Sequence, residues 1–263
     1  MTNNKNIILF VNDSYFSYLL AKDLIEKYHE NIALIVFSKS TTNSIVKIID
    51  IYKKVSLNYF IYRTFIQVLS KTLYRHKSVK YLSGKFNINT CDIFKANQLK
   101  EKIKYNFTGV GFAFNFDVII KKDLLSKFEK GIYNIHASRL PEDKGISPVL
   151  WAFARGDEKI WTTIYKMDEG IDSGPIAKQF QTHVSSNDTS FSIYRRVCIN
   201  SGNVLSSMVN DILHSEILLL DQTPASGSNY FSWPDKGFQK MMKTANRKMI
   251  NMRDILGKSN FTH

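Results

Sequence analysis

The sequence lacks several features that would assign it to a class of protein directly. It contains two cysteines in 263 residues, Cys91 and Cys198, which lie far apart and have no CxxC partner. A disulfide framework and a thiolate zinc site are therefore not expected, and no metal is predicted. No run of about 18 apolar residues occurs, so no membrane-spanning helix is predicted.

The sequence also lacks a secretory signal, and it has no excess of acidic residues. Residues 1–5 are polar and lead directly into a strand-like segment, so we expect a cytoplasmic protein. Asp and Glu number 23 against 36 Lys and Arg, which gives a formal charge of +13. This excess favours anionic partners, such as a nucleotide, a nucleic acid or a membrane surface, without choosing among them. The apolar fraction of 44% is enough for a sizeable core.

Short apolar runs alternate with helical segments through most of the chain. Residues 6–11 and 31–37 predict buried strands, and residues 15–28 between them have helical spacing. Further strands are expected at 109–114, 131–136, 161–167, 175–180 and 217–220, and further helices at 96–105, 121–130 and 190–214. The alternation predicts an α/β fold with a doubly wound, mostly parallel, Rossmann-like sheet. Such sheets bind ligands outside the carboxyl ends of their strands.

The composition changes after residue 220. We therefore expect a catalytic domain over residues 1–220 and a C-terminal extension over 221–263, which is first rich in Pro, Ser and Gly and later basic and Met-rich. Residues 44–82 predict two helices within the first domain, with a basic second half. An amphipathic membrane-surface helix is the alternative there, but aromatic and aliphatic residues at helical spacing more often form core.

Polar side chains end the strand expected at residues 131–136. Asn134, His136 and Ser138 share one face because alternate residues of a strand point the same way, while Ile135 and Ala137 face the core. Polar groups at the end of a buried strand are costly unless they are hydrogen-bonded or used. Taken alone, His136 is as well explained by a structural role as by a functional one.

A second polar cluster lies at residues 168–175. Three acids, Asp168, Glu169 and Asp172, occur with two glycines that permit tight turns. A solvated acidic hairpin loop explains this cluster in isolation. A calcium loop does not, because the oxygen spacing of an EF-hand is absent.

Together the two clusters supply complementary chemistry. An amide and an imidazole can donate hydrogen bonds to a developing oxyanion, and a carboxylate can orient the imidazole. The sequence has no GxSxG elbow that would present a serine nucleophile. Direct attack on a carbonyl by a substrate amine is the simplest reaction that fits.

These motifs resemble the signature of a known family. The run NIHASRLP at residues 134–141, then Gly145 and Ser147-Pro148, then the run IDSGP at residues 171–175 look like those of formyltransferases that use N10-formyltetrahydrofolate. The resemblance covers roughly residues 84–220. It implies a catalytic triad of Asn134, His136 and Asp172, with the folate as co-substrate and no metal.

The resemblance also implies binding residues. The folate pocket would involve Phe116, Val118, Ile119, Ile120, Asp168, Gly170 and Ile171. One departure is visible: the family often has a basic pair before the glycine of the proline loop, where residues 142–144 are Glu-Asp-Lys. We interpret it as a difference in substrate contacts rather than in chemistry.

Three branches of this family differ in the amine that they formylate. The branch acting on methionyl-tRNA carries a C-terminal β-barrel of about five strands, which residues 221–263 are too short to form. The branch acting on glycinamide ribonucleotide has less beyond the core. The segment 230–234 resembles the β-hairpin tail of sugar formyltransferases, so we favour a nucleotide-linked aminosugar, of the dTDP-4-amino-4,6-dideoxyhexose type used in lipopolysaccharide O-antigen biosynthesis. Ser138, Lys144, Tyr230 and Trp233 are the expected substrate contacts.

Non-enzymatic alternatives stay open at this point. The chain could be a folate- or nucleotide-binding protein without turnover, although the intact triad argues against it. It could also be a nucleic-acid-binding module that uses basic helices in residues 53–80 and 236–253, with steeply salt-dependent binding. We otherwise expect no nucleic-acid partner and no membrane span. A homodimer is compatible with the sequence, which does not determine the oligomeric state.

Overall fold

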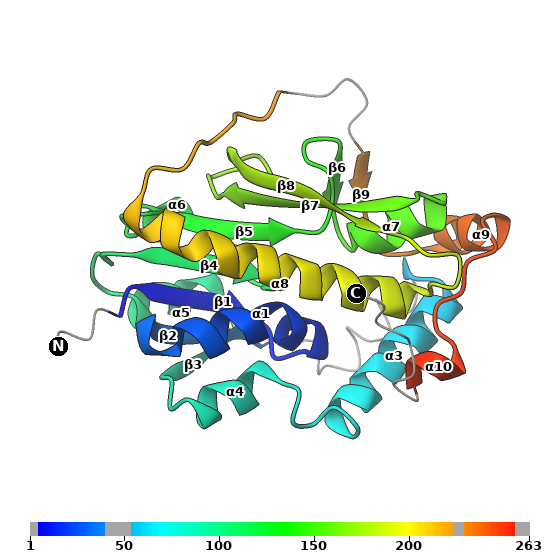
Figure 1. Ribbon diagram of the computed structural model, residues 1–263, viewed down its shortest axis with the longest axis horizontal. Helices are drawn as coiled ribbons and strands as arrows, with labels where there is room; N and C mark the ends of the chain where they lie inside the picture. Colours follow the sequence, from blue (N-terminus) through cyan, green and yellow to red (C-terminus); the bar gives the residue numbers. More distant parts are fainter. Residues whose placement is uncertain (1–4, 40–53, 224–228, 256–263) are drawn as a thin grey trace.

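A seven-stranded sheet organises the computed structural model, which describes residues 5–39, 54–223 and 229–255 (Figure 1). Its strands, in spatial order, are β3 (Thr90–Ile93), β2 (Ile32–Ser38), β1 (Ile7–Val11), β4 (Val110–Phe114), β5 (Ile132–His136), β7 (Lys159–Lys166) and β8 (Ile176–His183). The first five run parallel, whereas β7 is antiparallel to both β5 and β8. This confirms the predicted α/β class with a mostly parallel sheet.

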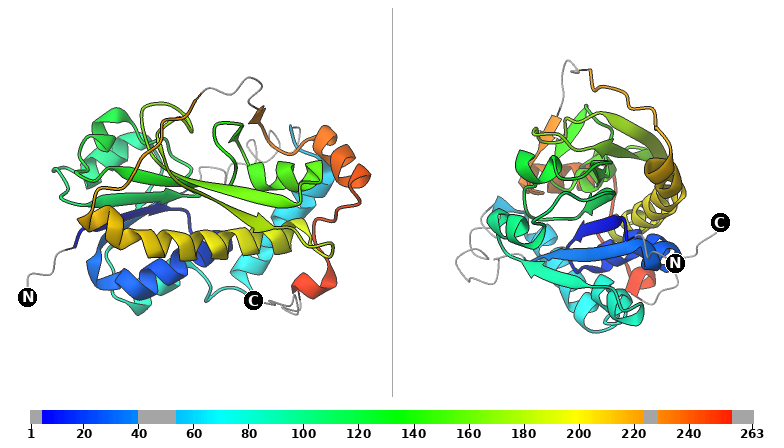
Figure 2. Two further views of the ribbon diagram at one scale, coloured as in Figure 1. Left: turned by 45° about the horizontal axis from the view of Figure 1, so that its top comes forward. Right: turned by 90° about the vertical axis from the view of Figure 1, so that its left-hand side faces the viewer.

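Helices cover both faces of the sheet (Figures 1 and 2). The helices are α1 (Tyr15–Tyr28), α3 (Leu57–Lys71), α4 (Val79–Lys85), α5 (Ala96–Lys102), α6 (Lys122–Leu125), α7 (Pro148–Arg155), α8 (Ser190–His214), α9 (Lys236–Thr244) and α10 (Met252–Ile255), with one 3₁₀ turn at His29–Asn31. The long helix α8 packs along α1 over the larger of two apolar clusters. Helices α5 and α6 contribute to the smaller cluster, on the other side of the sheet. No helix in the described part of the chain is long and apolar enough to cross a membrane.

Local sequence signals locate the two best-defined helices. Both α1 and α8 span the predicted residues, and each begins at a side-chain cap: Ser14 accepts from the Ser17 amide and Thr189 accepts from the Ser192 amide. The buried face of α3 includes Tyr59, Tyr62, Ile66 and Leu69, so this helix does pack on the core. The first part of the segment 44–82 lies outside the described residues.

Other predictions were wrong in detail. The strand expected at 217–220 is only an isolated bridge between Leu220 and Ile176, and the helix expected at 121–130 is reduced to α6. The helix α7, which begins at Pro148, was not predicted. Its helical periodicity was concealed because every residue of α7 from Pro148 to Ala154 is buried, which leaves no polar face to mark the turns.

The C-terminal extension is part of the same core. Phe238 of α9 is 1% exposed and belongs to the larger apolar cluster. The sequence predicted a β-hairpin in the extension. Its described residues instead form the strand β9 (Asn229–Phe231), which pairs in parallel with β6 (Asp143–Gly145) of the proline loop. A Cβ on Gly145 would lie 2.2 Å from the Phe231 carbonyl oxygen, so glycine is required for this pairing. The domain boundary at residue 220 stays a prediction.

Two helical glycines provide a matched test of this packing. A Cβ at Gly202 of α8 would lie 2.4 Å from the Leu20 backbone oxygen of α1, whereas a Cβ at Gly84 of α4 would meet nothing within 4 Å. We expect Gly202→Ala to lower the free energy of unfolding by about 1–3 kcal/mol, because α1 and α8 must separate. Gly84→Ala should raise it by about 0.5–1 kcal/mol, through helix propensity. Denaturant titration measures both, and equal stability of the two variants would contradict the packing described.

Candidate active site

Strand β5 presents the first two candidate residues. Asn134 and His136 lie on the side of the sheet that carries Ile132 and the smaller apolar cluster. Tyr133 and Ile135 point into the larger cluster on the other side. The alternation predicted from the sequence is therefore confirmed, and both polar side chains emerge on one face near the carboxyl end of the strand.

Asp172 reaches this face by an indirect route. Because β7 is antiparallel to β5, the turn after β7 starts beside the beginning of β5, where the Met167 amide donates to the Ile132 carbonyl. The turn then folds back, and Asp172 has φ of 51°, in the left-handed region. Its Oδ2 lies 3.7 Å from His136 Nε2 and accepts a hydrogen bond from the Gly145 amide at 3.4 Å. The structure thus brings together the three residues that the sequence singled out.

A fourth residue, Tyr165 of β7, lies between them and was missed. It is the register partner of Asn134 across β5 and β7. Asn134 Nδ2 donates to the Tyr165 hydroxyl at 2.9 Å, and this hydroxyl donates to Asp172 Oδ1 at 2.9 Å. A tyrosine inside an apolar strand looks like core from the sequence, and only the pairing of β5 with β7 reveals its position.

The His136 imidazole is neutral in this environment. Burial lowers its pKa below the usual 6.5, and the nearby charge of Asp172 opposes this only in part. The Lys144 ammonium lowers the pKa further, while the Asp143 backbone is a hydrogen-bond partner of the ring. Nε2 is buried and makes no hydrogen bond. Protonation of His136 is therefore not favoured before substrates bind.

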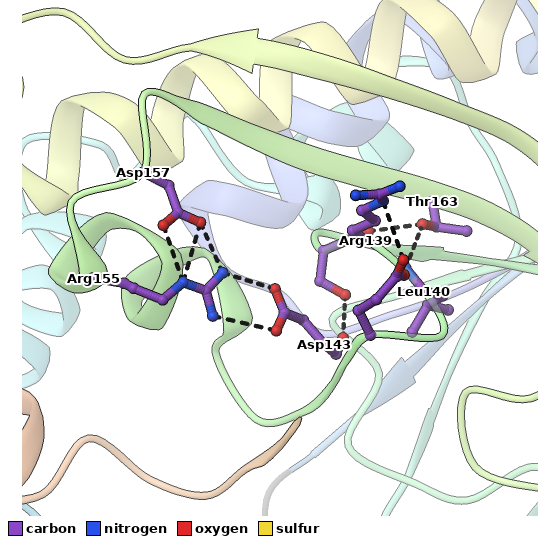
Figure 3. Close-up of polar contacts among 8 residues, drawn as sticks. Arg139, Leu140, Asp143, Arg155, Asp157 and Thr163 are labelled. Atoms are coloured by element: carbon purple, nitrogen blue, oxygen red, sulfur yellow. Dashed lines mark hydrogen bonds and ion pairs between the residues drawn. The ribbon is translucent and has the colours of Figure 1, made fainter. Parts of the chain in front are cut away.

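An internal ion pair explains the unusual sequence of the proline loop (Figure 3). The Arg155 guanidinium, at the end of α7, binds both carboxylate oxygens of Asp143 at 3.3 and 2.9 Å and also pairs with Asp157. Asp143 is 8% exposed. Asp143, one of the three residues of this departure, therefore serves the fold of the loop. The interpretation of the departure as a difference in substrate contacts stays a prediction for Lys144.

The same loop is tied to β7. The Thr163 hydroxyl donates to the Ser138 carbonyl at 2.7 Å and accepts from the Leu140 amide at 3.2 Å, just before the cis peptide bond at Pro141 (Figure 3). The Ser138 hydroxyl is itself buried and donates to the Asp143 carbonyl. Ser138 was expected to contact substrate, and in the structure its hydroxyl serves the loop.

The segments expected to bind folate lie side by side. An ion pair joins Lys122, just after the first segment, to Glu169 in the second. Ile119 and Ile171 expose 70% and 61% of their surface, one from each segment. Phe116 and Val118 are partly buried against the smaller cluster and Ile120 lies within it, while Asp168 accepts from the Gly170 amide and the Ser173 hydroxyl. Ile119 and Ile171 are thus exposed apolar side chains on neighbouring loops.

The other expected substrate contacts gather on the β6–β9 ribbon. Lys144 and Tyr230 are register partners, and Tyr230 is exposed. Trp233 lies beyond β9, with the Arg63 guanidinium of α3 4.7 Å above its ring. Two cations, Lys144 and Arg63, and two aromatic rings, Tyr230 and Trp233, thus come together in pairs from three parts of the sequence.

Thiolate and metal chemistry find little support among the described residues. Burial raises the pKa of both cysteine thiols, so thiolate chemistry is not favoured. No group of three His, Cys, Asp or Glu among the described residues could hold a metal ion. What the site can do is donate hydrogen bonds to a carbonyl oxygen and accept a proton from an attacking amine.

Comparison with known protein families agrees with this chemistry. Residues 96–209 match the formyl transferase family model. A methionyl-tRNA formyltransferase of Myxococcus xanthus is 34% identical over 109 residues, 41% of this chain and 35% of that protein. The bifunctional polymyxin resistance protein ArnA of Wigglesworthia glossinidia brevipalpis is 31% identical over 137 residues, 51% of this chain and 21% of that protein. The matches thus span about a third or less of these relatives.

Solved structures show the same fold at low sequence identity. WlaRD, a sugar 3N-formyl transferase solved with dTDP and 5-N-formyl-THF, gives a TM-score of 0.61 at 20% identity over 86% of this chain and 69% of its own. A 4-N formyltransferase from Francisella tularensis gives 0.56 at 18% identity over 96% and 86%. Residues 96–209, which match the formyl transferase family model, contain Asn134, His136 and Asp172.

Proposed function

We propose that the protein transfers a formyl group from N10-formyltetrahydrofolate to the amino group of a nucleotide-linked aminosugar. The observation that carries the formyl-transfer part is the convergence of Asn134, His136 and Asp172 in one buried site. N10-formyltetrahydrofolate supplies the formyl carbon, and the surface offered by Ile119 and Ile171 would hold its rings. Asp168, Gly170, Phe116, Val118 and Ile120 shape the same two segments.

The residues of the site divide the chemical work. The uncharged substrate amine attacks the formyl carbon, and negative charge develops on the formyl oxygen. The Asn134 amide is a donor at every pH and can stabilise this charge. A proton leaves the attacking nitrogen and one reaches the departing nitrogen of the folate, so the transfer consumes no net proton.

His136 is suited to move that proton because it starts neutral. Once it accepts a proton, its positive charge lies 3.7 Å from the Asp172 carboxylate and close to the developing oxyanion. The Asp172 carboxylate and the developing oxyanion both stabilise the imidazolium. In the ligand-free site the oxyanion is missing, and the neutral imidazole is favoured. Asp172 therefore acts on the charge of His136 as well as on its position.

The aminosugar acceptor is supported by the β6–β9 ribbon. Lys144 offers charge to a diphosphate, and Tyr230 and Trp233 offer rings to a base. An N-formyltransferase from Helicobacter canadensis, solved with folinic acid and dTDP-3-aminofucose, has the same fold with a TM-score of 0.59. Methionyl-tRNA is the second candidate acceptor because several sequence relatives act on it.

The role of Asp172 can be tested by Asp172→Asn. We expect turnover to fall by about 10²–10⁴-fold with the fold retained, since the amide neither accepts a proton nor stabilises an imidazolium. Formyl transfer is measured as release of tetrahydrofolate, and folding by thermal denaturation. Asp211→Asn, an exposed position on α8, is the control. Turnover within a factor of about two of the wild type would contradict the assignment.

The acceptor is identified by supplying the folate donor with a panel of substrates. The panel contains dTDP- and UDP-linked aminosugars, glycinamide ribonucleotide and methionyl-tRNA. We expect transfer to a nucleotide-linked aminosugar. Transfer to methionyl-tRNA alone would overturn the acceptor while leaving formyl transfer intact.

A lysine substitution separates substrate binding from chemistry. Lys144→Ala should raise the KM for the nucleotide sugar roughly tenfold, as expected for a lost charge-assisted hydrogen bond of about 1.4 kcal/mol. The folate KM should stay unchanged, and the effect should shrink at high salt. Lys104→Ala, at an exposed position remote in sequence, is the control. An unchanged sugar KM would remove Lys144 from the binding site.

A further inference from the structure

A single hydroxyl group connects two members of the triad. Tyr165 is 3% exposed, and its oxygen accepts from the Asn134 amide and donates to the Asp172 carboxylate, both at 2.9 Å. These distances are those of well-formed hydrogen bonds, whereas Asp172 and His136 are 3.7 Å apart. The hydrogen bond from Tyr165 is thus shorter than the contacts that Asp172 makes with Gly145 and His136.

Few side chains could occupy this position. The group must accept a hydrogen bond from an amide and donate one to a carboxylate at the same atom, which a hydroxyl does and a carboxylate or an ammonium does not. Burial, followed by the charge of Asp172, raises the pKa of the Tyr165 phenol well above its usual 10. The hydroxyl therefore keeps its proton throughout the range in which an enzyme works and remains a donor to Asp172.

Asp172 needs such a restraint because its backbone is in a sparsely populated conformation. Its φ of 51° is unusual for a residue other than glycine. The other hydrogen bond to its carboxylate comes from the Gly145 amide and is long, at 3.4 Å. Tyr165 holds Oδ1, and Oδ2 is thereby directed toward His136.

Asn134 is restrained by the same group. One N–H of its amide is bound to the Tyr165 oxygen, which fixes the plane of the amide. The Asn134 and Tyr165 backbones are paired across β5 and β7, so the anchor is built on two strands rather than on a loop. Donors held by rigid strands lose little free energy in reorganising when charge develops.

We propose that Tyr165 is a positioning residue for formyl transfer, whose hydroxyl fixes the Asn134 amide and the Asp172 carboxylate relative to His136. This inference rests on the proposed function, and it adds to the triad a residue that acts through two of its members.

The test compares Tyr165→Phe with Tyr133→Phe. Both remove one hydroxyl from a buried tyrosine of adjacent strands, but Tyr133 points into the larger apolar cluster. For Tyr165→Phe we expect kcat to fall about 10–100-fold, as for a modest misplacement of catalytic groups, with both KM values within about twofold. Tyr133→Phe should keep the wild-type kcat. Thermal denaturation of both variants shows whether each is folded.

The pH profile separates positioning from a general loss of packing. The titratable and charged groups that act on His136 and Tyr165 are Asp172 and Asp168 in the turn after β7, and Asp143 and Lys144 on β6. Loss of the Tyr165 hydroxyl changes the position of the Asp172 charge relative to His136, so the acidic limb of kcat/KM, which follows the protonation of His136, should move in Tyr165→Phe. A purely structural defect would lower the rate at every pH without moving this limb.

A second measurement does not depend on activity. Proton NMR of His136 reports the nearby charge of Asp172, so the pKa of His136 should change in Tyr165→Phe and stay at its wild-type value in Tyr133→Phe. If the wild-type chain fails to transfer formyl groups, the proposed function fails and this titration still decides whether Tyr165 positions Asp172. A folded Tyr165→Phe variant with unchanged His136 titration overturns the inference, as does one with unchanged kcat and pH profile.

Discussion

The antiparallel pairing of β5 with β7 is the constraint on which the site depends. It sets Tyr165 opposite Asn134, and it sends the turn after β7 toward the beginning of β5. Asp172 can meet His136 only because that turn folds back over the sheet.

Burial gives this small polar network its chemical character. Unpaired polar groups are costly in such surroundings, and the hydrogen bonds from Asn134 to Tyr165 and from Tyr165 to Asp172 remove most of that cost. His136 Nε2 is the exception, since it is buried without a hydrogen bond and its pKa is lowered. The hydrogen bonds thus hold Asn134, Tyr165 and Asp172 in place, while the hydrogen-bonding capacity of His136 Nε2 is left unsatisfied.

The proline loop is held in place by contacts from its own residues and from neighbouring elements. The Arg155–Asp143 pair, together with the Thr163 hydroxyl, ties this loop to α7 and β7. The loop in turn supplies the Gly145 amide to Asp172 and a backbone partner to His136. The ion pair therefore acts on the fold of the site, although neither Asp143 nor Arg155 belongs to the triad.

The sequence by itself determined the α/β class, the bounds of α1 and α8, and the shared face of Asn134 and His136. These follow from caps, from helical spacing and from strand alternation, which are local properties of the chain. Only the tertiary structure decided how Asp172 approaches, that β9 pairs with β6 instead of forming a hairpin, and that Tyr165 joins two members of the triad. Those outcomes depend on strand direction and register between segments far apart in sequence, and local patterns carry no information about either.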